Sequence, residues 1–123
     1  MYMASGTVDV RINAAVGTIV FKREERRNAL SRAMVAELQQ AFDDLHQEKR
    51  VRAVVLTGSG TAFCSGLDVR EMQSLDSLPD HEKEQQWGDA AEEYRALVAQ
   101  MIEFPKPIIA SVNGPAVAGG AGL

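Results

Sequence analysis

The sequence is poor in the residues that usually mark disulfide-rich, metal-binding or nucleic-acid-binding proteins. Its single cysteine, Cys64, cannot form an internal disulfide and fits a reducing compartment. Two histidines and one cysteine offer no recognisable metal-ligand spacing, so no metal site is predicted. With 13 basic against 17 acidic residues, the net charge of -4 argues against a dedicated nucleic-acid surface.

Long apolar runs are also missing. No stretch approaches the roughly 18 residues that suggest a membrane span, and residues 1–9 lack the charged-then-apolar order of a secretory signal. We therefore expect a cytoplasmic protein that does not enter a membrane. The length of 123 residues, with 46% hydrophobic and 24% charged residues, predicts one globular domain over residues 1–123.

Patterns of apolar residues predict an α/β chain that opens with a β-hairpin. Residues 7–12 alternate apolar and polar side chains, residues 13–17 carry turn chemistry, and residues 16–21 return as a second strand. Ser31 is a good N-cap, and the apolar stripe after it predicts a helix from about Arg32 to Gln47. The chain is therefore expected to begin as strand, strand, helix.

Strands and helices continue in the second part of the chain. Continuous apolar runs at residues 53–57 and 107–113 have the length of strands covered on both faces of a sheet. A short helix over residues 69–75 and a longer one from about residue 80 to residue 104 are expected between them. The apolar stripe of the longer helix, with its tryptophan and tyrosine, is expected to pack in the core, and lining of an acyl pocket is the alternative.

Two glycine-rich loops follow the two apolar runs. Residues 63–68 read Phe-Cys-Ser-Gly-Leu-Asp, and Gly66 allows the N–H of Leu67 to come close to a ligand. The second loop reads Gly-Pro-Ala-Val-Ala-Gly-Gly-Ala-Gly-Leu and follows residues 107–113. Two N–H groups that converge from such loops form an oxyanion hole, which stabilises developing charge by about 2.7–4 kcal/mol per donor. The favoured chemistry is oxyanion or enolate stabilisation of an acyl group.

The motifs FCSGLDV and KPIIASVNGPAVAGGAGL, with RNALS upstream, resemble the crotonase (enoyl-CoA hydratase/isomerase) superfamily from about Val8 to Leu123. The resemblance implies an α/β, crotonase-like spiral of ββα units, of which this chain holds the N-terminal half only and stops within the second oxyanion-loop motif. It implies an acyl-CoA substrate, with coenzyme A as part of the substrate and no prosthetic group. The N–H groups of Leu67 and Gly119 would be the catalytic donors, and the intact protein would form a homo-oligomer, a trimer or a hexamer.

The resemblance also implies a set of substrate-binding residues: Arg26, Ala29, Ser65, Gly66, Leu67, Asp68, Val69 and Gly119. Ser65 would meet the adenine through its carbonyl, and Arg26 or Arg27 would contact a phosphate. Taken by themselves, arginines in a polar loop are more often solvated, so that alternative stays open. Asp68 is expected to cap free N–H groups at a helix start rather than to act as an acid or base.

One position departs from the family pattern. The first of the two catalytic glutamates would fall at Gly122, which has no side chain to transfer a proton, and the second would lie beyond Leu123. The reaction therefore stays open between hydratase, isomerase and other types, and we expect no useful turnover from this chain alone. The alternative function is a non-catalytic acyl-CoA-binding or assembly module.

Four other candidates for chemistry are set aside. Cys64 is predicted to be a small buried hydrophobic residue, and His46 and His81 are predicted to face solvent. The turn at residues 58–60 is not expected to bind nucleotide phosphates, because no Lys-Ser/Thr pair follows it.

Overall fold

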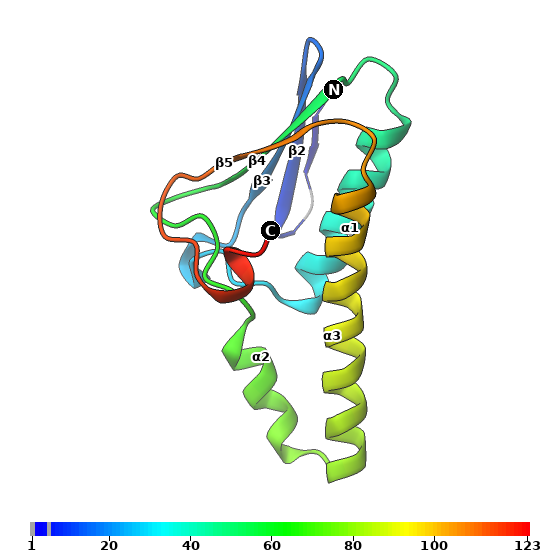
Figure 1. The fold of residues 1–123 in the computed structure, drawn as a ribbon. Coiled ribbons are helices and arrows are strands. Elements are labelled where there is room, and N and C mark those ends of the chain that lie inside the picture. The colour runs from blue at the N-terminus through cyan, green and yellow to red at the C-terminus, as the bar shows by residue number, and fades with distance from the viewer. Residues whose placement is uncertain (1, 5) are drawn as a thin grey trace.

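A computed structural model describes residues 2–4 and 6–123, and side chains from residue 6 onward. Within these residues one sheet has the strand order β1-β2-β3-β4-β5 (Figure 1). The first three strands are antiparallel, and β4 and β5 then add in parallel. The strands are β1 (Tyr2–Ala4), β2 (Val8–Asn13), β3 (Val16–Phe21), β4 (Ala53–Gly58) and β5 (Ile108–Ser111).

The predicted hairpin is confirmed as β2 and β3, which pair from Val8 with Phe21 to Asn13 with Val16. The strands predicted at residues 53–57 and 107–113 are β4 and β5, which pair in parallel, and β5 is shorter than expected at both ends. Strand β1 was not predicted. Its three residues are too few to show a period, and it forms because β2 offers an edge with which to pair.

The predicted helices form close to their expected positions. They are α1 (Arg32–Gln47), α2 (Val69–Gln73) and α3 (Asp80–Glu103), with short 3-10 turns at Glu24–Arg26, Ser74–Ser77 and Ala118–Gly120. Ser31 caps α1 as predicted, since its hydroxyl accepts a hydrogen bond of 3.1 Å from the N–H of Met34. None of the described helices is both long and apolar enough to span a membrane.

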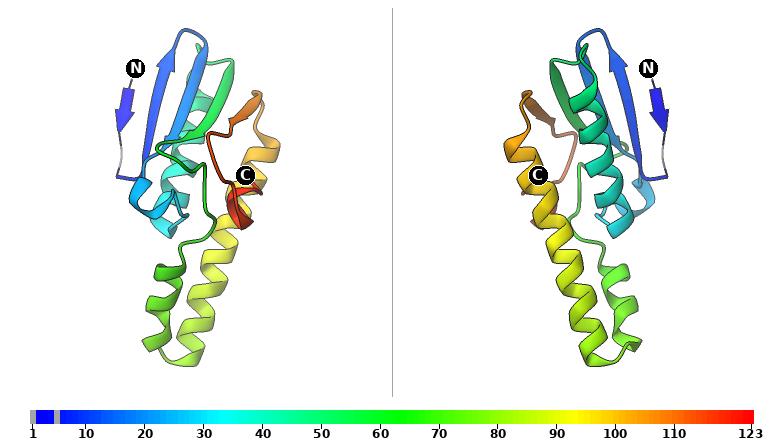
Figure 2. Two further views of the ribbon diagram at one scale, coloured as in Figure 1. Left: turned by 90° about the vertical axis from the view of Figure 1, so that its left-hand side faces the viewer. Right: turned by 90° about the vertical axis from the view of Figure 1, so that its right-hand side faces the viewer.

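The core lies between α1 and one face of the sheet (Figure 2). Each large apolar side chain buried there contributes about 1.5–3 kcal/mol. The helix contributes Met34, Val35, Leu38, Ala41, Phe42 and Leu45, and the strands contribute Val8, Val10, Ile19, Phe21, Val54 and Leu56.

The expectation that β4 and β5 are covered on both faces is wrong for the part of the chain that the structure describes. Val54 and Leu56 are buried, but Val55 between them is only partly buried, and Ile109 in β5 is 55% exposed. The reason is that α1 covers one face of the sheet, so alternate residues of each strand point away from it.

The expectation that the α3 stripe packs in the core is confirmed for Tyr94, Leu97 and Met101 and is wrong for the stripe residues before Tyr94 and for Ile102. Leu97 is the one α3 residue that is fully buried, whereas Trp87 is 40% exposed and Ile102 is 79% exposed. In Figure 1 the first half of α3 extends with α2 beyond the sheet as a helical hairpin, so no strand lies beneath it. This hairpin places Trp87 and Tyr94 beside the candidate site.

Candidate functional site

The first glycine loop is held along one edge by the segment that precedes α1. The N–H of Leu30 donates to the carbonyl of Gly66 at 2.7 Å, and the N–H of Asp68 donates to the carbonyl of Leu30 at 3.0 Å. Successive backbone groups of an extended segment point to opposite edges, so the N–H of Leu67 points away from Leu30. Gly66 has φ +93, a left-handed conformation that glycine adopts without strain.

The second glycine loop pairs with the first. The N–H of Phe63 donates to the carbonyl of Pro115 at 3.0 Å, and the N–H of Val117 donates to the carbonyl of Cys64 at 3.0 Å. The approach is so close that a Cβ on Gly120 would lie 2.2 Å from the Cys64 oxygen. A side chain at Gly120 is therefore excluded.

The pairing of the loops brings Leu67 and Gly119 to one place. A Cβ on Gly66, the residue before Leu67, would lie 3.4 Å from the nitrogen of Gly119. Within residues 2–4 and 6–123, no acceptor takes a hydrogen bond from the N–H of Leu67 or of Gly119. Both residues line the same cavity. Two N–H groups from separate loops are therefore available to one ligand.

That cavity has a volume of about 470 Å³ and lies between the glycine loops, the start of α1 and the α2–α3 hairpin. Its surface is mostly apolar. The apolar side chains lining it are Leu30, Val35, Leu67, Val69, Met72, Leu75, Trp87, Ala90, Ala91 and Ala118. The dimensions and polarity suit an acyl group of moderate size.

Two asparagine side chains, the buried Asn28 and the exposed Asn113, hold the turn that leads into the first loop. Asn28 donates to the carbonyls of Ser59 and Ala62, each at 3.0 Å, and accepts from the N–H of Arg23 at 2.8 Å. Asn113, just before the second loop, donates to the carbonyl of Ala62 at 3.1 Å and accepts from the N–H of Gly58 at 3.0 Å. Sequence reasoning missed both residues as anchors, although each lies within a recognised motif, RNALS or KPIIASVNG.

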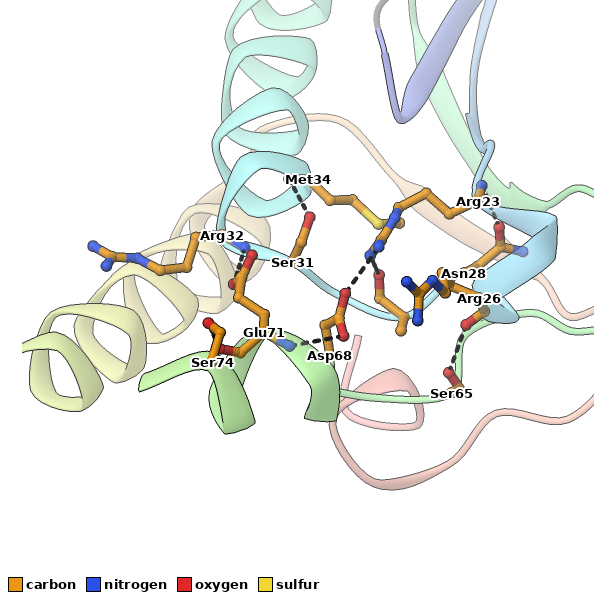
Figure 3. Close-up of polar contacts among 11 residues, drawn as sticks. Arg23, Arg26, Asn28, Ser31, Arg32, Met34, Ser65, Asp68, Glu71 and Ser74 are labelled. Carbon is orange, nitrogen blue, oxygen red and sulfur yellow. Dashed lines mark hydrogen bonds and ion pairs between the residues drawn. The ribbon is translucent and has the colours of Figure 1, made fainter. Parts of the chain in front are cut away.

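Asp68 caps α2 as predicted, because its Oδ1 accepts from the N–H of Glu71 at 3.2 Å. Figure 3 shows that Asp68 also accepts from the guanidinium of Arg23, at 2.8 Å. Burial opposes ionisation, but the hydrogen bonds from Arg23 and Glu71 and the charges of Arg23 and Arg26 outweigh it, so the pKa of Asp68 lies below its ordinary value. Arg23, in the same loop, is therefore held by Asp68.

Arg32 joins the three helices at the mouth of the cavity. Its backbone N–H donates to Glu71 at 2.8 Å, and its guanidinium donates to Glu93 at 2.7 and 2.8 Å and to Gln86 at 2.6 Å. The Arg32 hydrogen bond holds the pKa of Glu93 below its ordinary value. With Asp68, these are the three carboxylates that line the cavity, and each already has a partner.

The predicted site residues divide into two groups. Ser65, Leu67, Asp68, Val69 and Gly119 line the cavity, and Gly66 lies behind them. Arg26 and Ala29 lie in the adjacent loop and do not line it. The carbonyl of Arg26 accepts from the Ser65 hydroxyl at 3.3 Å, as Figure 3 shows, so the two predicted coenzyme contacts are neighbours.

Sequence reasoning also missed a polar contact made by Tyr94, which lines the cavity from α3. Its hydroxyl donates to the carbonyl of Gly119 at 2.8 Å. Only the helical stripe pointed to this residue, and a stripe carries no information about a loop 25 residues away.

The residues set aside as non-catalytic lie as expected. Cys64 is fully buried, and burial raises the pKa of its thiol. His46 and His81 are exposed. Among the described residues, no three His, Cys, Asp or Glu side chains gather closely enough to hold a metal ion.

Solved structures define the class of fold. A crystal structure of enoyl-CoA hydratase from Bacillus anthracis superposes with a TM-score of 0.84 at 31% identity, over 95% of this chain and 43% of that one. The predicted fold class is therefore confirmed: this is a mixed α/β crotonase-like fold that matches about the first half of such structures.

Sequence comparison then establishes the family. The Enoyl-CoA hydratase/isomerase family model matches residues 11–123. A Thermus thermophilus protein provisionally named an enoyl-CoA hydratase is 43% identical over 114 residues, which are 88% of this chain and 41% of the relative. The 4-chlorobenzoyl coenzyme A dehalogenase-2 of an Arthrobacter species is 34% identical over 116 residues, 94% of this chain and 41% of that protein. The chain belongs to the enoyl-CoA hydratase/isomerase family and spans about two fifths of the length of these relatives.

Proposed function

We propose that this chain binds the thioester of an acyl-CoA and stabilises negative charge on its carbonyl oxygen through the N–H groups of Leu67 and Gly119. The observation that carries the proposal is that these two donors come from separate loops, have no acceptor among the described residues, and line one cavity. Oriented donors in an apolar cavity are worth more than the same donors in water, because no solvent reorganises around the charge.

The surroundings of the two donors support an acyl-CoA as the ligand. The mostly apolar cavity would take the acyl group, and the loop around Ser65 and Arg26 would take the coenzyme. Arg26 also carries the charge that a phosphate requires. We also propose that the intact protein is cytosolic and forms a trimer or a hexamer.

The reaction that we propose for the intact protein is of the hydratase or isomerase type, with enolate stabilisation as this chain's contribution. Proton transfer is not assigned to the residues described here. Gly122 has no side chain, and the three carboxylates of the cavity are held by Arg23, Arg32 and backbone N–H groups. The same observation favours the second candidate, a non-catalytic acyl-CoA-binding or assembly module.

Isothermal titration calorimetry with two ligands tests the oxyanion contacts. Crotonyl-CoA carries the thioester carbonyl, whereas S-butyl-CoA has a chain of equal length and no carbonyl oxygen. We expect this chain to bind the thioester about three- to tenfold more tightly, as one or two hydrogen bonds would give. Leu67→Pro removes one of the two N–H donors and should reduce the difference, while Leu67→Ala keeps the N–H and should retain the full difference. Equal affinity of the wild type for both ligands would contradict the proposal.

Hydration of crotonyl-CoA separates the two candidate functions. The enzyme candidate predicts turnover by the intact protein and none by this chain alone above a heat-treated control. A binding or assembly module predicts thioester binding by both and turnover by neither.

A further inference from the structure

The peptide groups on both sides of Gly119 are held by hydrogen bonds. The carbonyl of Ala118, which shares its peptide group with the N–H of Gly119, accepts from the N–H of Ala121 at 3.0 Å. On the other side, the carbonyl of Gly119 accepts from the N–H of Gly122 at 3.2 Å and from the Tyr94 hydroxyl at 2.8 Å. Glycine has the widest choice of backbone conformations, so its orientation depends on such contacts.

Tyr94 supplies the one of these bonds that comes from outside the loop. Its ring packs against the hydrophobic core, and its hydroxyl reaches the loop from α3. The other bonds are local to residues 117–122, where a short 3-10 turn has weak hydrogen-bond geometry. Loss of the tyrosine hydroxyl would therefore leave Gly119 tied only to its own neighbours.

Gly122 is the residue that leaves room for this contact. A Cβ at position 122 would lie 2.9 Å from the Tyr94 hydroxyl, closer than a side-chain carbon and a hydroxyl normally approach. Any side chain there would displace the hydroxyl from the Gly119 carbonyl. The glycine that departs from the expected glutamate is thus spatially coupled to the tyrosine.

We infer that Tyr94 is the positioning residue that aims the N–H of Gly119 at the thioester oxygen, and that Gly122 is required because the tyrosine hydroxyl occupies the space beside it. The inference rests on the proposed function and names the residue that orients one of its two donors. Burial is the main cause that raises the pKa of Tyr94, so the hydroxyl keeps its proton and donates at neutral pH.

Nuclear magnetic resonance on the full 123-residue chain, labelled with ¹⁵N, tests the positioning without any ligand. Tyr94→Phe keeps the packed ring and removes the donor, and Gly122→Ala displaces the donor. Each change is expected to lower the order parameter of the Gly119 amide from about 0.85 towards 0.6. Gly88→Ala is the matched control. Gly88 lies on the same helix as Tyr94, and a Cβ at this position would have no atom within 4 Å. The control should leave the Gly119 amide unchanged.

Calorimetry with crotonyl-CoA and S-butyl-CoA measures the ratio of the two affinities. A general loss of stability would not change this ratio, whereas misplacement of the Gly119 N–H would. Tyr94→Phe should weaken thioester binding about two- to threefold and leave thioether binding unchanged, because only the thioester uses the N–H of Gly119. If the wild type prefers the thioester, and Tyr94→Phe has the same Gly119 order parameter and the same thioester preference as the wild type, the inference is overturned and the proposed function stands. If the wild type shows no preference, the oxyanion contacts and their positioning by Tyr94 both fail.

Discussion

At the scale of single residues, the candidate site is built by polar side chains that satisfy backbone groups of loops. Asn28 and Asn113 donate hydrogen bonds to the carbonyl of Ala62, and Asp68 accepts one from the N–H of Glu71. These backbone groups have no partner strand, so the side chains take its place. Asn28 is fully buried and has φ 57, a left-handed conformation that asparagine tolerates better than most residues. The loops that carry Leu67 and Gly119 are therefore held by side-chain contacts as well as shaped by glycines.

Replacing Asn28 with alanine is expected to lower the free energy of unfolding by about 2–3 kcal/mol. The change leaves the buried carbonyl of Ala62 with one donor fewer and leaves the N–H of Arg23 without its acceptor. Urea denaturation followed by circular dichroism measures the change. Arg27→Ala is the matched control, since Arg27 has φ 50 but is exposed. A cost for Arg27→Ala as large as for Asn28→Ala would show that backbone strain, not the buried hydrogen bonds, is responsible.

Asp68 should make stability depend on pH. Its pKa in the folded chain lies below the ordinary value of about 4, so ionised Asp68 stabilises the fold fully above that value. The stabilisation is lost as the pH falls through the folded-state pKa. We expect the free energy of unfolding of Asp68→Asn to be about 1–3 kcal/mol lower than that of the wild type at pH 7, and the gap to close progressively as the pH falls below about 4.

The control for this pH dependence is Asp76→Asn, because the Asp76 carboxylate is 63% exposed beside Lys83. Exposed ion pairs contribute little, so the control should stay within about 0.5 kcal/mol of the wild type. Urea unfolding at a series of pH values measures both variants. A gap between Asp68→Asn and the wild type that stays constant down to pH 2 would show that the Arg23 pair does not carry the effect.

At the scale of elements, α3 has two different functions along its length. Its second half packs against α1 and buries Leu97, while its first half extends past the sheet and lines the cavity with Trp87. Tyr94, near the middle of the helix, contacts both the core and the cavity. The helical period of the apolar residues therefore predicted the helix correctly, but it did not predict what the apolar face of the helix contacts. An apolar stripe can face a ligand cavity as well as a core.

Leu97→Ala is expected to cost about 2–5 kcal/mol in unfolding free energy, because the side chain is fully buried and its removal leaves a cavity. Ile102→Ala on the same helix should cost less than about 0.5 kcal/mol, since Ile102 is 79% exposed. Thermal and urea unfolding measure both variants. Equal costs would mean that Leu97 is not packed in the core as described.

At the scale of the whole molecule, the described chain leaves apolar surface uncovered near β5 and the second glycine loop. The exposed apolar side chains there and on the end of α3 are Ile102, Ile109, Val112 and Val117. β5 is also an edge strand of the described sheet, with backbone groups free on one side. Surface of this kind favours association between molecules.

We expect the purified chain to self-associate, with an apparent mass that rises with concentration in light scattering. The double variant Ile102→Lys, Ile109→Lys should lower the association constant at least about tenfold, because it charges the exposed surface. The double variant Gln47→Lys, Gln85→Lys adds the same charge at exposed polar positions and is the control. If the control lowers association equally, net charge and not apolar contact is responsible.

The sequence by itself determined the elements and the short motifs. Alternation, helical period, caps and glycine turns act over a few residues, so the β2–β3 hairpin, α1, α3 and the helix cap at Asp68 were predictable. The two candidate donors were found because each lies within a continuous glycine-rich motif. Strand β1 and the uncovered face of the sheet could not be predicted, because both depend on what lies next to a segment in space.

The tertiary structure decided how the motifs meet. Arg23 reaches Asp68 across 45 positions of sequence, Asn28 reaches Ala62 across 34, and Tyr94 reaches Gly119 across 25. No local pattern encodes such pairs, since each arises only when the parallel pairing of β3, β4 and β5 places the loops at one end of the sheet. The glycine at position 122 shows the difference: in the sequence it is a missing glutamate, and in the structure it is the space beside the hydroxyl of a tyrosine.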